Sequence, residues 1–317
     1  MPVAPLELTI RPLSGPDELG LFCRLSYVLD HELADDLATG RRRPEWMWVA
    51  LRGEQVVARV AWWTSKDGGA PLALDFFDLD DTLPAQERQE IGVRLLETAM
   101  AAVVPADVER PEYGRFIPPD WREDPAAREV VEARIRVMEE TGARMLVERL
   151  RLEWREGTPV PADPGRLVFR PVTGREDLVA LMTPVMEGTL DAHGQADLAT
   201  GIGAREAAEK HYDEEFAGYS TPQEWWRIAE LPDGEPVGFV IPARNNYHPI
   251  IAYIGVLPAH RGKGYIDDIL AEGTRVLVEQ GVDRIRAATD LGNVPMAKSF
   301  ERLGYVNFER AFNMVWG

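Results

Sequence analysis

The stretch VLPAHRGKGY (residues 256–265) decides the fold of the second half of the chain. It follows the β-branched run at residues 250–256, which predicts a strand. It precedes apolar residues at i, i+3, i+4 and i+7 from Ile266, which predict a helix. Glycines at such a junction let the backbone adopt positive φ and approach a ligand. The loop and helix N–H groups then favour an anion, so we predict a pyrophosphate site with charge from Arg261 and Lys263. Glycines that serve turn geometry alone are the alternative.

The segments around this loop predict an α/β unit with a mixed sheet. Residues 225–231 and 235–243 flank a Pro-Asp-Gly turn and predict a hairpin. The helix after the loop should end at Gly281, because glycine commonly terminates helices. The remaining elements are expected to be a strand at 284–289, a helix at 295–303 and a strand at 308–316.

The chain repeats itself. IRPLSGPDEL (10–19) matches FRPVTGREDL (169–178), and DLATG occurs at 36–40 and again at 197–201. The segments ending at Trp154 and Trp316 also match, and all three offsets lie near 160 positions. Proline and glycine are frequent at 155–165, which is typical of a linker. We therefore expect domains at 1–155 and 166–317, joined by a linker at 156–165.

The order of motifs in the second copy resembles the GNAT superfamily of acyl-CoA-dependent acyltransferases. The V-x-P-x-x-R-G-x-G run is followed by D-x-x-N (290–293) and SFERLGY (299–305). The resemblance implies two tandem GNAT-like domains, each with a mixed, mostly antiparallel twisted sheet flanked by helices. It also implies that loop N–H groups hold the pyrophosphate of acetyl-CoA or another acyl-CoA, and that a bulged strand, with Gly255 as the expected bulge, pairs with pantetheine. The implied cofactor-binding residues are Ile254, Gly255, Val256, Arg261, Gly262, Lys263, Gly264, Tyr265, Ile266, Asn293 and Phe300.

Several residues depart from the family pattern. Ile266 stands where the family has glycine or alanine, and its side chain either narrows the loop or turns into the core. Phe300 replaces a tyrosine that protonates the leaving CoA thiolate in many members, and phenylalanine has no proton to give. Tyr265 or a water is the expected substitute acid. Asp267 and Asp268 would oppose phosphate binding unless they point away from it.

The first copy has lost the loop. Its corresponding segment, DTLPAQERQEIG (81–92), lacks the paired glycines and contains Glu87 and Glu90. We therefore expect the first copy to be a degenerate domain that does not bind CoA, packs against the second copy and shapes its acceptor cleft.

Two groups of residues are candidates for the catalytic base. Acylation of an amine requires a base, and members of the family often have a glutamate near the start of the central strand. His248 is the nearest titratable group there in this chain, with an exposed histidine at a hairpin tip as the alternative. A second cluster is Glu187, Asp191 and His193, for which a solvated loop is the alternative. Glu187 is the next candidate base.

The composition limits the remaining possibilities. The net charge of −18 argues against a nucleic-acid binder. Cys23 is the single cysteine, so no intramolecular disulfide can form, and no metal-ligand spacing occurs. We find no signal-like start and no apolar run of the ~18 residues that a membrane span needs. These features predict a cytoplasmic, metal-free monomer or homodimer with no membrane partner.

The sequence thus predicts an N-acetyltransferase that moves an acetyl or similar acyl group from acyl-CoA directly to a primary amine of a small molecule. The layout is similar to that of mycothiol synthase, which would make a cysteinyl amino sugar a special case of the acceptor. A non-catalytic acyl-CoA-binding or regulatory module is the alternative, motivated by Phe300 and the missing strand carboxylate.

Overall fold

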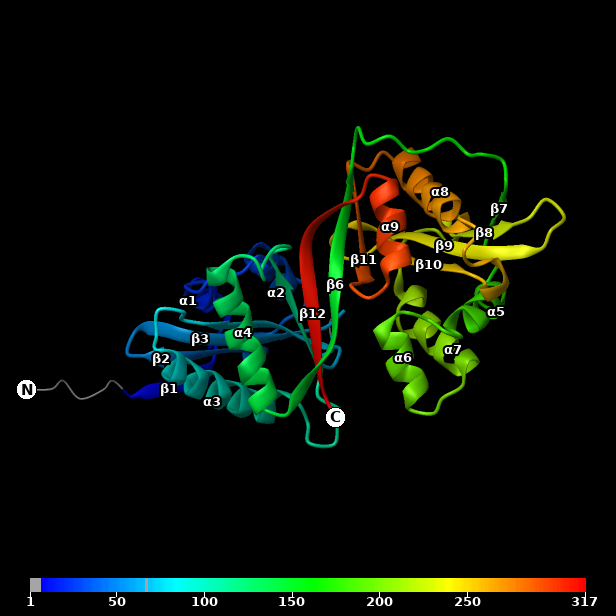
Figure 1. Ribbon diagram of the computed structural model, residues 1–317. Helices are drawn as coiled ribbons and strands as arrows, with labels where there is room; N and C mark the ends of the chain where they lie inside the picture. The colour runs from blue at the N-terminus through cyan, green and yellow to red at the C-terminus, as the bar shows by residue number, and fades with distance from the viewer. Residues whose placement is uncertain (1–6, 66–67) are drawn as a thin grey trace, which may run out of the picture. The chain divides into compact units, whose positions relative to one another are not determined.

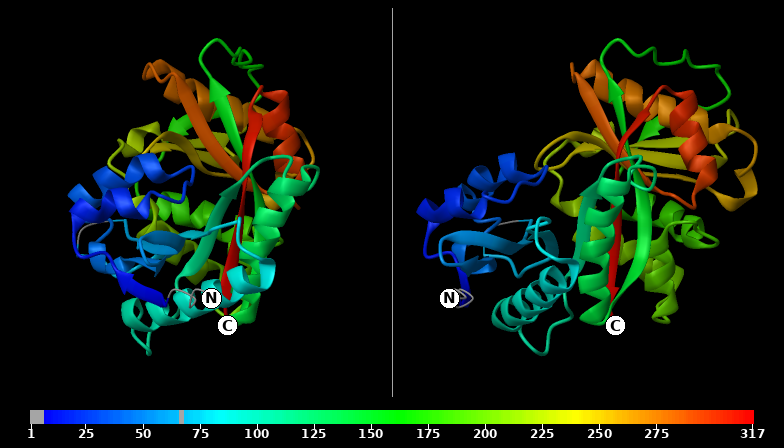
Figure 2. Two further views of the ribbon diagram at one scale, coloured as in Figure 1. Left: turned by 90° about the vertical axis from the view of Figure 1, so that its left-hand side faces the viewer. Right: turned by 60° about the vertical axis from the view of Figure 1, so that its left-hand side comes forward.

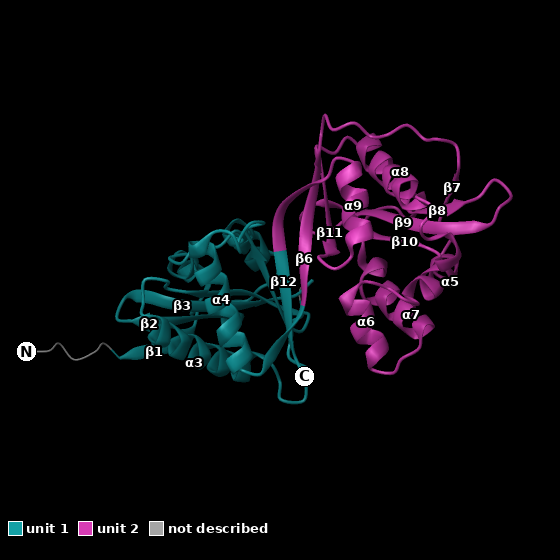
Figure 3. Cartoon of the chain, viewed as in Figure 1, with its two compact units in different colours: residues 1–146, 311–317 teal, residues 147–310 magenta. Residues whose placement is uncertain are grey.

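The computed structural model describes residues 7–65 and 68–317, which divide into two compact units (Figure 3). Unit 1 contains the residues up to Leu146 together with Ala311–Gly317, and unit 2 contains Val147–Arg310. Each unit has a mixed sheet with helices packed against it, so the predicted fold class is confirmed.

Unit 1 has the strand order β1-β2-β3-β4-β5-β12. Most neighbouring strands are antiparallel, but β4 and β5 are parallel. The helices and strands that lie wholly in this unit are β1 (Leu8–Pro12), α1 (Leu19–Phe22), α2 (Leu33–Ala38), β2 (Met47–Arg52), β3 (Gln55–Trp63), β4 (Ala73–Leu79), α3 (Ala85–Val103), β5 (Glu112–Ile117) and α4 (Pro125–Glu140).

Unit 2 has the strand order β12-β6-β11-β10-β9-β8-β7, with β10 and β11 parallel (Figure 1). Its own elements are β7 (Val168–Pro171), α5 (Arg175–Met186), α6 (Ala192–Ala199), α7 (Ala204–Glu214), β8 (Arg227–Glu230), β9 (Pro236–Arg244), β10 (Pro249–Val256), α8 (Tyr265–Glu279), β11 (Arg284–Asp290) and α9 (Val294–Arg302). The predicted hairpin, the helix after the loop and the final strand–helix–strand are all confirmed within two residues at their ends.

Helices cover both faces of the sheet of unit 2. The helices α8 and α9 share one apolar core, which includes Leu270 and Phe300. The helices α5 and α7 share a second core on the opposite face, which includes Met182 and Phe216. Both views in Figure 2 show α8 and α9, coloured orange to red, together on one face.

The last strand of each sequence copy crosses into the other unit. Strand β6 (Ala143–Arg155) ends the first copy, yet its Leu152 and Trp154 are buried in the core of unit 2. Strand β12 (Val306–Trp316) ends the second copy, yet its Phe312 and Met314 are buried in the core of unit 1. The ranges 1–155 and 166–317 therefore describe copies along the chain, whereas the compact units exchange terminal strands.

The two units repeat the same elements with one addition. Helices α2 and α6 are followed by Gly40 and Gly201, which have φ of 72° and 96° and take left-handed backbone that glycine adopts without strain. After Gly40, residues 41–46 lead to β2, and their helical part is one 3-10 turn. After Gly201, residues 202–226 include the whole of α7. Helix α7 is thus an insertion in the second copy.

Candidate active site

Strands β10 and β11 separate from each other along unit 2. Among the described residues they pair at Ile250 and Arg286 and diverge beyond that point. The register of β10 against β9 shifts between Ile251 and Tyr253, which marks a bulge at Ala252. The bulge predicted at Gly255 was therefore wrong by three residues. Gly255 instead permits close packing of α5, because a Cβ there would lie 2.9 Å from Val185 Cγ1.

The glycine loop joins β10 to α8 as predicted. Gly262 and Gly264 have φ of 75° and 78°, and Gly264 is the N-cap of α8. The first N–H groups of a helix have no partner within that helix. Tyr265 and Ile266 therefore present N–H groups, together with the positive end of the helix dipole, where a phosphate group is favoured.

The charged side chains of the loop are arranged differently from the sequence-based interpretation. The Arg261 guanidinium donates to the carbonyl oxygens of Val256, Glu187 and Val185 at 3.0–3.2 Å, so it ties the loop to the end of α5. Lys263 is exposed. Arg166, which the sequence did not single out, donates to the Gly264 carbonyl at 3.2 Å.

Both carboxylates of the first turn of α8 are paired with arginines, Asp267 with one on α9 and Asp268 with one beside the loop. Asp267 accepts from Ser299 and Arg302, and Asp268 accepts from Arg166. Burial acts to raise the pKa of Asp267, but the hydrogen bonds from Arg302 and Ser299 outweigh it and lower that pKa. The two negative charges are therefore neutralised locally, as phosphate binding requires.

A cavity of about 390 Å³ runs from the glycine loop along the gap between β10 and β11. Its walls come from β10, the loop, α8, α9, the end of β11 and the segment between α5 and α6. The lining residues are Arg149, Val185, Gly188, Thr189, Leu190, Asp191, Ile251, Ala252, Tyr253, Ile254, Gly255, Val256, His260, Arg261, Gly262, Gly264, Tyr265, Ile266, Ala288, Thr289, Asn293, Pro295, Met296 and Phe300. Ten of the eleven predicted cofactor residues line it, with Lys263 outside.

Four of those residues have additional structural roles. Asn293 caps α9 through a hydrogen bond from the Met296 N–H at 3.3 Å. Ile266 and Tyr265 pack against the core on the α8 side, so the isoleucine turns inward. Phe300 is 1% exposed.

His248 and Glu187 do not reach this cavity. His248 precedes β10, whereas the cavity lining on that strand begins at Ile251. Burial and nearby Arg286 lower the pKa of His248 to about 4, which makes its imidazole a weak base. Glu187 is exposed just after α5, and it is Gly188 to Asp191 that line the cavity. This geometry does not favour either residue as the catalytic base.

A charged cluster that includes the predicted residue Asp191 lies beside the cavity, which Arg149 and Asp191 line. Arg149 of β6 lies opposite Asp290 of β11, with 3.0 Å between Arg149 Nε and Asp290 Oδ1. Asp290 also accepts from the Ala192 N–H at 2.6 Å, which fixes the start of α6. Burial raises the pKa of Asp290, although this N–H and Arg149 oppose the shift. Asp191 lies 3.8 Å from Arg149 and caps α6.

His260 is a second residue that sequence reasoning missed. It is 5% exposed and lines the cavity beneath the loop. Its Nε2 lies 3.0 Å from Glu235, whereas its buried Nδ1 has no hydrogen-bond partner among the described residues. A buried polar atom without a partner is costly, so a ligand that reaches Nδ1 would gain a hydrogen bond.

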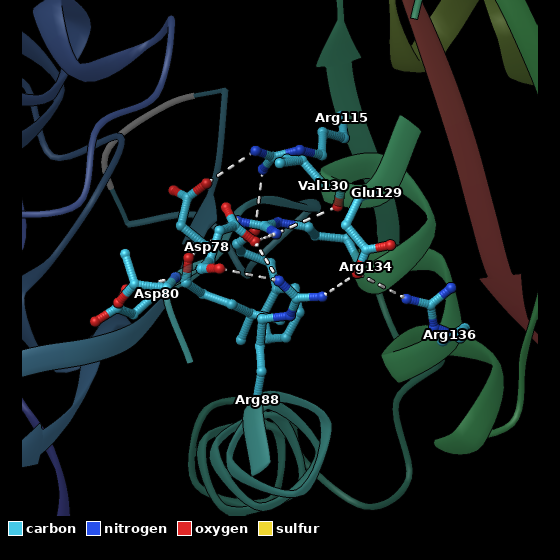
Figure 4. A network of polar contacts seen from close by, with 12 residues as sticks. Asp78, Asp80, Arg88, Arg115, Glu129, Val130, Arg134 and Arg136 are labelled. Carbon is cyan, nitrogen blue, oxygen red and sulfur yellow. Dashed lines mark hydrogen bonds and ion pairs between the residues drawn. The ribbon is translucent and has the colours of Figure 1, made fainter. Parts of the chain in front are cut away.

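The equivalent gap in unit 1 is occupied by arginines (Figure 4). Strands β4 and β5 pair at Ala73–Glu112 and Leu74–Tyr113 and then diverge. Arg115 of β5 donates to the Phe77 carbonyl at 3.0 Å and to Asp78 at 2.9 Å.

Arg134 of α4 adds a donor to the same strand, at 3.1 Å from the Leu79 carbonyl. Burial acts to raise the pKa of Asp78, but Arg115, Arg59 and Arg134 outweigh it and lower that pKa. Carbonyls of β4 that face the gap are thus already bonded to buried side chains.

Comparison with known proteins agrees with this geometry. Residues 197–305 match the model of the Acetyltransferase (GNAT) family. A GCN5-related N-acetyltransferase from Sphaerobacter thermophilus shares the fold at TM-score 0.59 and 15% identity, over 97% of this chain and 94% of that one. A tandem GNAT protein from the clavulanic acid biosynthesis pathway shares it at TM-score 0.52 and 16% identity, over 97% and 98%.

A third structure is similar over part of its own length. The glucosamine N-acetyltransferase region of a fungal multi-domain GH3 β-N-acetylglucosaminidase has TM-score 0.58 and 13% identity, over 98% of this chain and 38% of that one. No curated protein sequence matches this chain.

Residues 197–305, which lie in unit 2, therefore form a domain of the Acetyltransferase (GNAT) family. The fold of the chain, with its two units, is similar to that of the tandem GNAT protein.

Two findings concern other classes of site. Within residues 7–65 and 68–317, no three His, Cys, Asp or Glu side chains are grouped so that they could hold a metal ion. Within the same ranges, no helix has the length and apolar character to cross a membrane.

Proposed function

We propose that unit 2 transfers an acetyl or similar acyl group from acyl-CoA to a primary amine of a small molecule. The observation that carries the proposal is the continuity of one cavity from the α8 N-terminus to the divergence of β10 and β11. At one end of the cavity, the N–H groups of the loop and of α8 suit the diphosphate of CoA. The narrow pantetheine arm of CoA would fit between β10 and β11, where the facing backbone groups of the two strands are not paired with each other.

Each region of the cavity has a role in this reaction. Gly262 and Gly264 let the loop backbone approach the phosphates, while His260 and Asn293 offer polar atoms along the wall. The acyl group would lie near the Ala252 bulge. There the amine nitrogen attacks the thioester carbon, the C–S bond breaks and a proton leaves the amine. The thiolate that departs as CoA takes up a proton.

Unit 1 is assigned no acyl-CoA in this proposal. A ligand there would have to displace Arg115 and Arg134 from β4 and leave buried Asp78 without its partners. Breaking a buried ion pair by removing one partner costs about 3–5 kcal/mol. Helix α3 also begins directly after Pro84 without a glycine loop.

Turnover with acetyl-CoA tests the proposal. Release of CoA thiol should depend on an amine when a panel of primary amines, including diamines, amino sugars and amino acid amides, is supplied. Mass spectrometry should find one N-acetyl group on the consumed amine. Binding of acetyl-CoA without transfer to any amine would contradict the proposal.

That contrary result would favour the second candidate, a non-catalytic acyl-CoA-binding module. The specific observation behind this alternative is Phe300, which lines the cavity where many family members present a tyrosine acid. Because Phe300 cannot protonate a thiolate, the transfer reaction must take that proton from water or another side chain.

A further inference from the structure

We infer that His211, held by Glu215, is the base that takes the proton from the acceptor amine. The inference rests on the proposed transfer function and identifies a residue that the sequence analysis did not consider. The two side chains lie one turn apart at the end of α7. His211 Nε2 is 3.0 Å from Glu215 Oε2.

The hydrogen bond from the imidazole fixes which ring nitrogen can act as a base. Burial acts to raise the pKa of Glu215, but the hydrogen bond from His211 outweighs it and the pKa is lowered. The carboxylate is therefore ionised at neutral pH and accepts a hydrogen bond from Nε2–H, because an ionised carboxylate is an acceptor only. The lone pair of His211 then resides on Nδ1, which has no hydrogen-bond partner among the described residues.

Glu215 is itself held in position by a third group. The Tyr219 hydroxyl donates to Glu215 Oε1 at 2.5 Å, so both carboxylate oxygens are engaged. The resulting chain of tyrosine, glutamate and histidine matches the general pattern in which an acid orients a base. The His211 side chain remains 31% exposed, so a substrate can reach it.

Tyr253 places this group next to the cavity. The imidazole packs against the Tyr253 ring, with 5.0 Å between the centroids and 63° between the planes. Tyr253 immediately follows the bulge and lines the cavity where β10 and β11 diverge. In the proposed function this is where the acyl group would lie. His211 is not itself a lining residue, and its contact with Tyr253 connects it to the cavity.

The other charged groups around His211 favour the binding of a cationic amine. Arg149 of β6 interacts electrostatically with Glu215, and Asp191, the N-cap of α6, interacts with Tyr253. Burial raises the pKa of the Tyr253 phenol, with Asp191 and Glu215 adding to the shift, so this group stays neutral. Arg149 is already compensated by Asp290 at 3.0 Å, which leaves the surroundings of His211 net acidic.

The distribution of α7 between the units supports the same role. Helix α7 occurs in unit 2, which has the open cavity. In unit 1 the short segment at 41–46 stands in its place, and the gap there is filled by arginines. Within the described residues, the helix that carries His211 thus occurs in the unit with the open cavity and not in the unit whose gap is filled.

The proton transfer is balanced within the proposed reaction. The protonated alkylamine first gives one proton to His211 Nδ1, which becomes an imidazolium beside Glu215. The neutral nitrogen then forms the new C–N bond, and the second proton, which it loses as the amide forms, goes to the departing thiolate directly or through water. The C–S bond breaks, and the electron pair leaves with the CoA thiolate. The imidazolium then returns its proton to solvent.

The test compares two nucleophiles with different needs for a base. The probes are the fastest alkylamine of the panel described above, which is protonated at neutral pH, and hydroxylamine, which is largely neutral there. His211→Gln should lower kcat with the alkylamine by about 100-fold. It should change the rate with hydroxylamine by no more than about threefold and leave the affinity for acetyl-CoA unchanged.

Two further variants complete the experiment. Glu215→Gln should lower kcat with the alkylamine and leave the rate with hydroxylamine unchanged, because the neutral amide holds the imidazole less firmly than the carboxylate does. His31→Gln is the matched control, since His31 lies in unit 1 with a 70% exposed side chain and should behave as wild type.

Each contrary outcome has a distinct meaning. If His211→Gln acylates the alkylamine at the wild-type rate, or if its rates with the two nucleophiles fall by the same factor, His211 is not the base. The assignment as a transferase would still stand. If the wild-type protein binds acetyl-CoA but acylates no amine, the proposed function fails and this inference fails with it.

Discussion

Gly264→Val should weaken acetyl-CoA binding while the protein stays folded. Gly264 has φ of 78°, and a Cβ there would come no nearer than 4.0 Å to another side chain, that of Arg166. A Cβ at position 264 therefore clashes with no protein atom, and we expect the valine side chain to occupy the loop space that the phosphates need. The loss of one hydrogen bond to a charged group, worth about 1.5–3 kcal/mol, corresponds to a 10- to 100-fold weaker Kd.

Gly281→Val is the matched control for backbone strain. Gly281 follows the far end of α8 and has φ of 75°, and a Cβ added there would have no other atom within 4 Å. Both variants place a side chain in left-handed backbone at a cost of about 1–2 kcal/mol. Chemical denaturation should therefore show similar losses of unfolding free energy, and calorimetry should show weaker acetyl-CoA binding for Gly264→Val alone. Equal affinities in two folded variants would refute the loop assignment.

The remaining predictions concern the opposite wall, the hairpin and the exchanged strands. Phe300→Tyr should keep or raise turnover, whereas Phe300→Ala should lower the free energy of unfolding by about 3–5 kcal/mol, measured by denaturant titration. Because the pKa of His248 is lowered from 6.5 to about 4, the unfolded state binds more protons between these values. The protein should thus lose stability as pH falls through that window, and His248→Gln should flatten the loss without changing turnover at pH 7. A fragment of residues 166–317 lacks Leu152 and Trp154 and should show no cooperative thermal transition by circular dichroism.

The local elements of unit 2 could be predicted because their signals are local. The loop could be located from Gly262 and Gly264 once a strand before them and a helix after them were predicted. Both of these elements were predicted from the pattern of apolar residues. The inward turn of Ile266 also follows from its place on the apolar face of α8. Ten lining residues of the cavity were found in this way.

The features that were missed depend on contacts between distant segments. Arg149 reaches the cavity because β6 leaves its own copy, and nothing in residues 143–155 indicates which sheet that strand joins. The bulge at Ala252 depends on the register with β9. His211 and Glu215 have helical i, i+4 spacing, but most such pairs are surface ion pairs, and their meaning emerges only beside Tyr253.

The arginines of unit 1 are another feature that depends on contacts between distant segments. Absence of the glycine loop at 81–92 predicted that the first copy does not bind CoA. No local pattern indicated that Arg115 and Arg134 would bond to the carbonyls of β4, because these partners are 38 and 55 positions away. The missing glycine loop predicted that the first copy has no CoA site, and the bonded β4 carbonyls support that prediction.

Titration of the full chain with acetyl-CoA in a calorimeter tests the central claim most directly. The account predicts one acetyl-CoA per chain, abolished or strongly weakened by Gly264→Val and unaffected by Glu87→Gln in the corresponding segment of unit 1. A stoichiometry of two, or binding that survives Gly264→Val and is lost with Glu87→Gln, would contradict it.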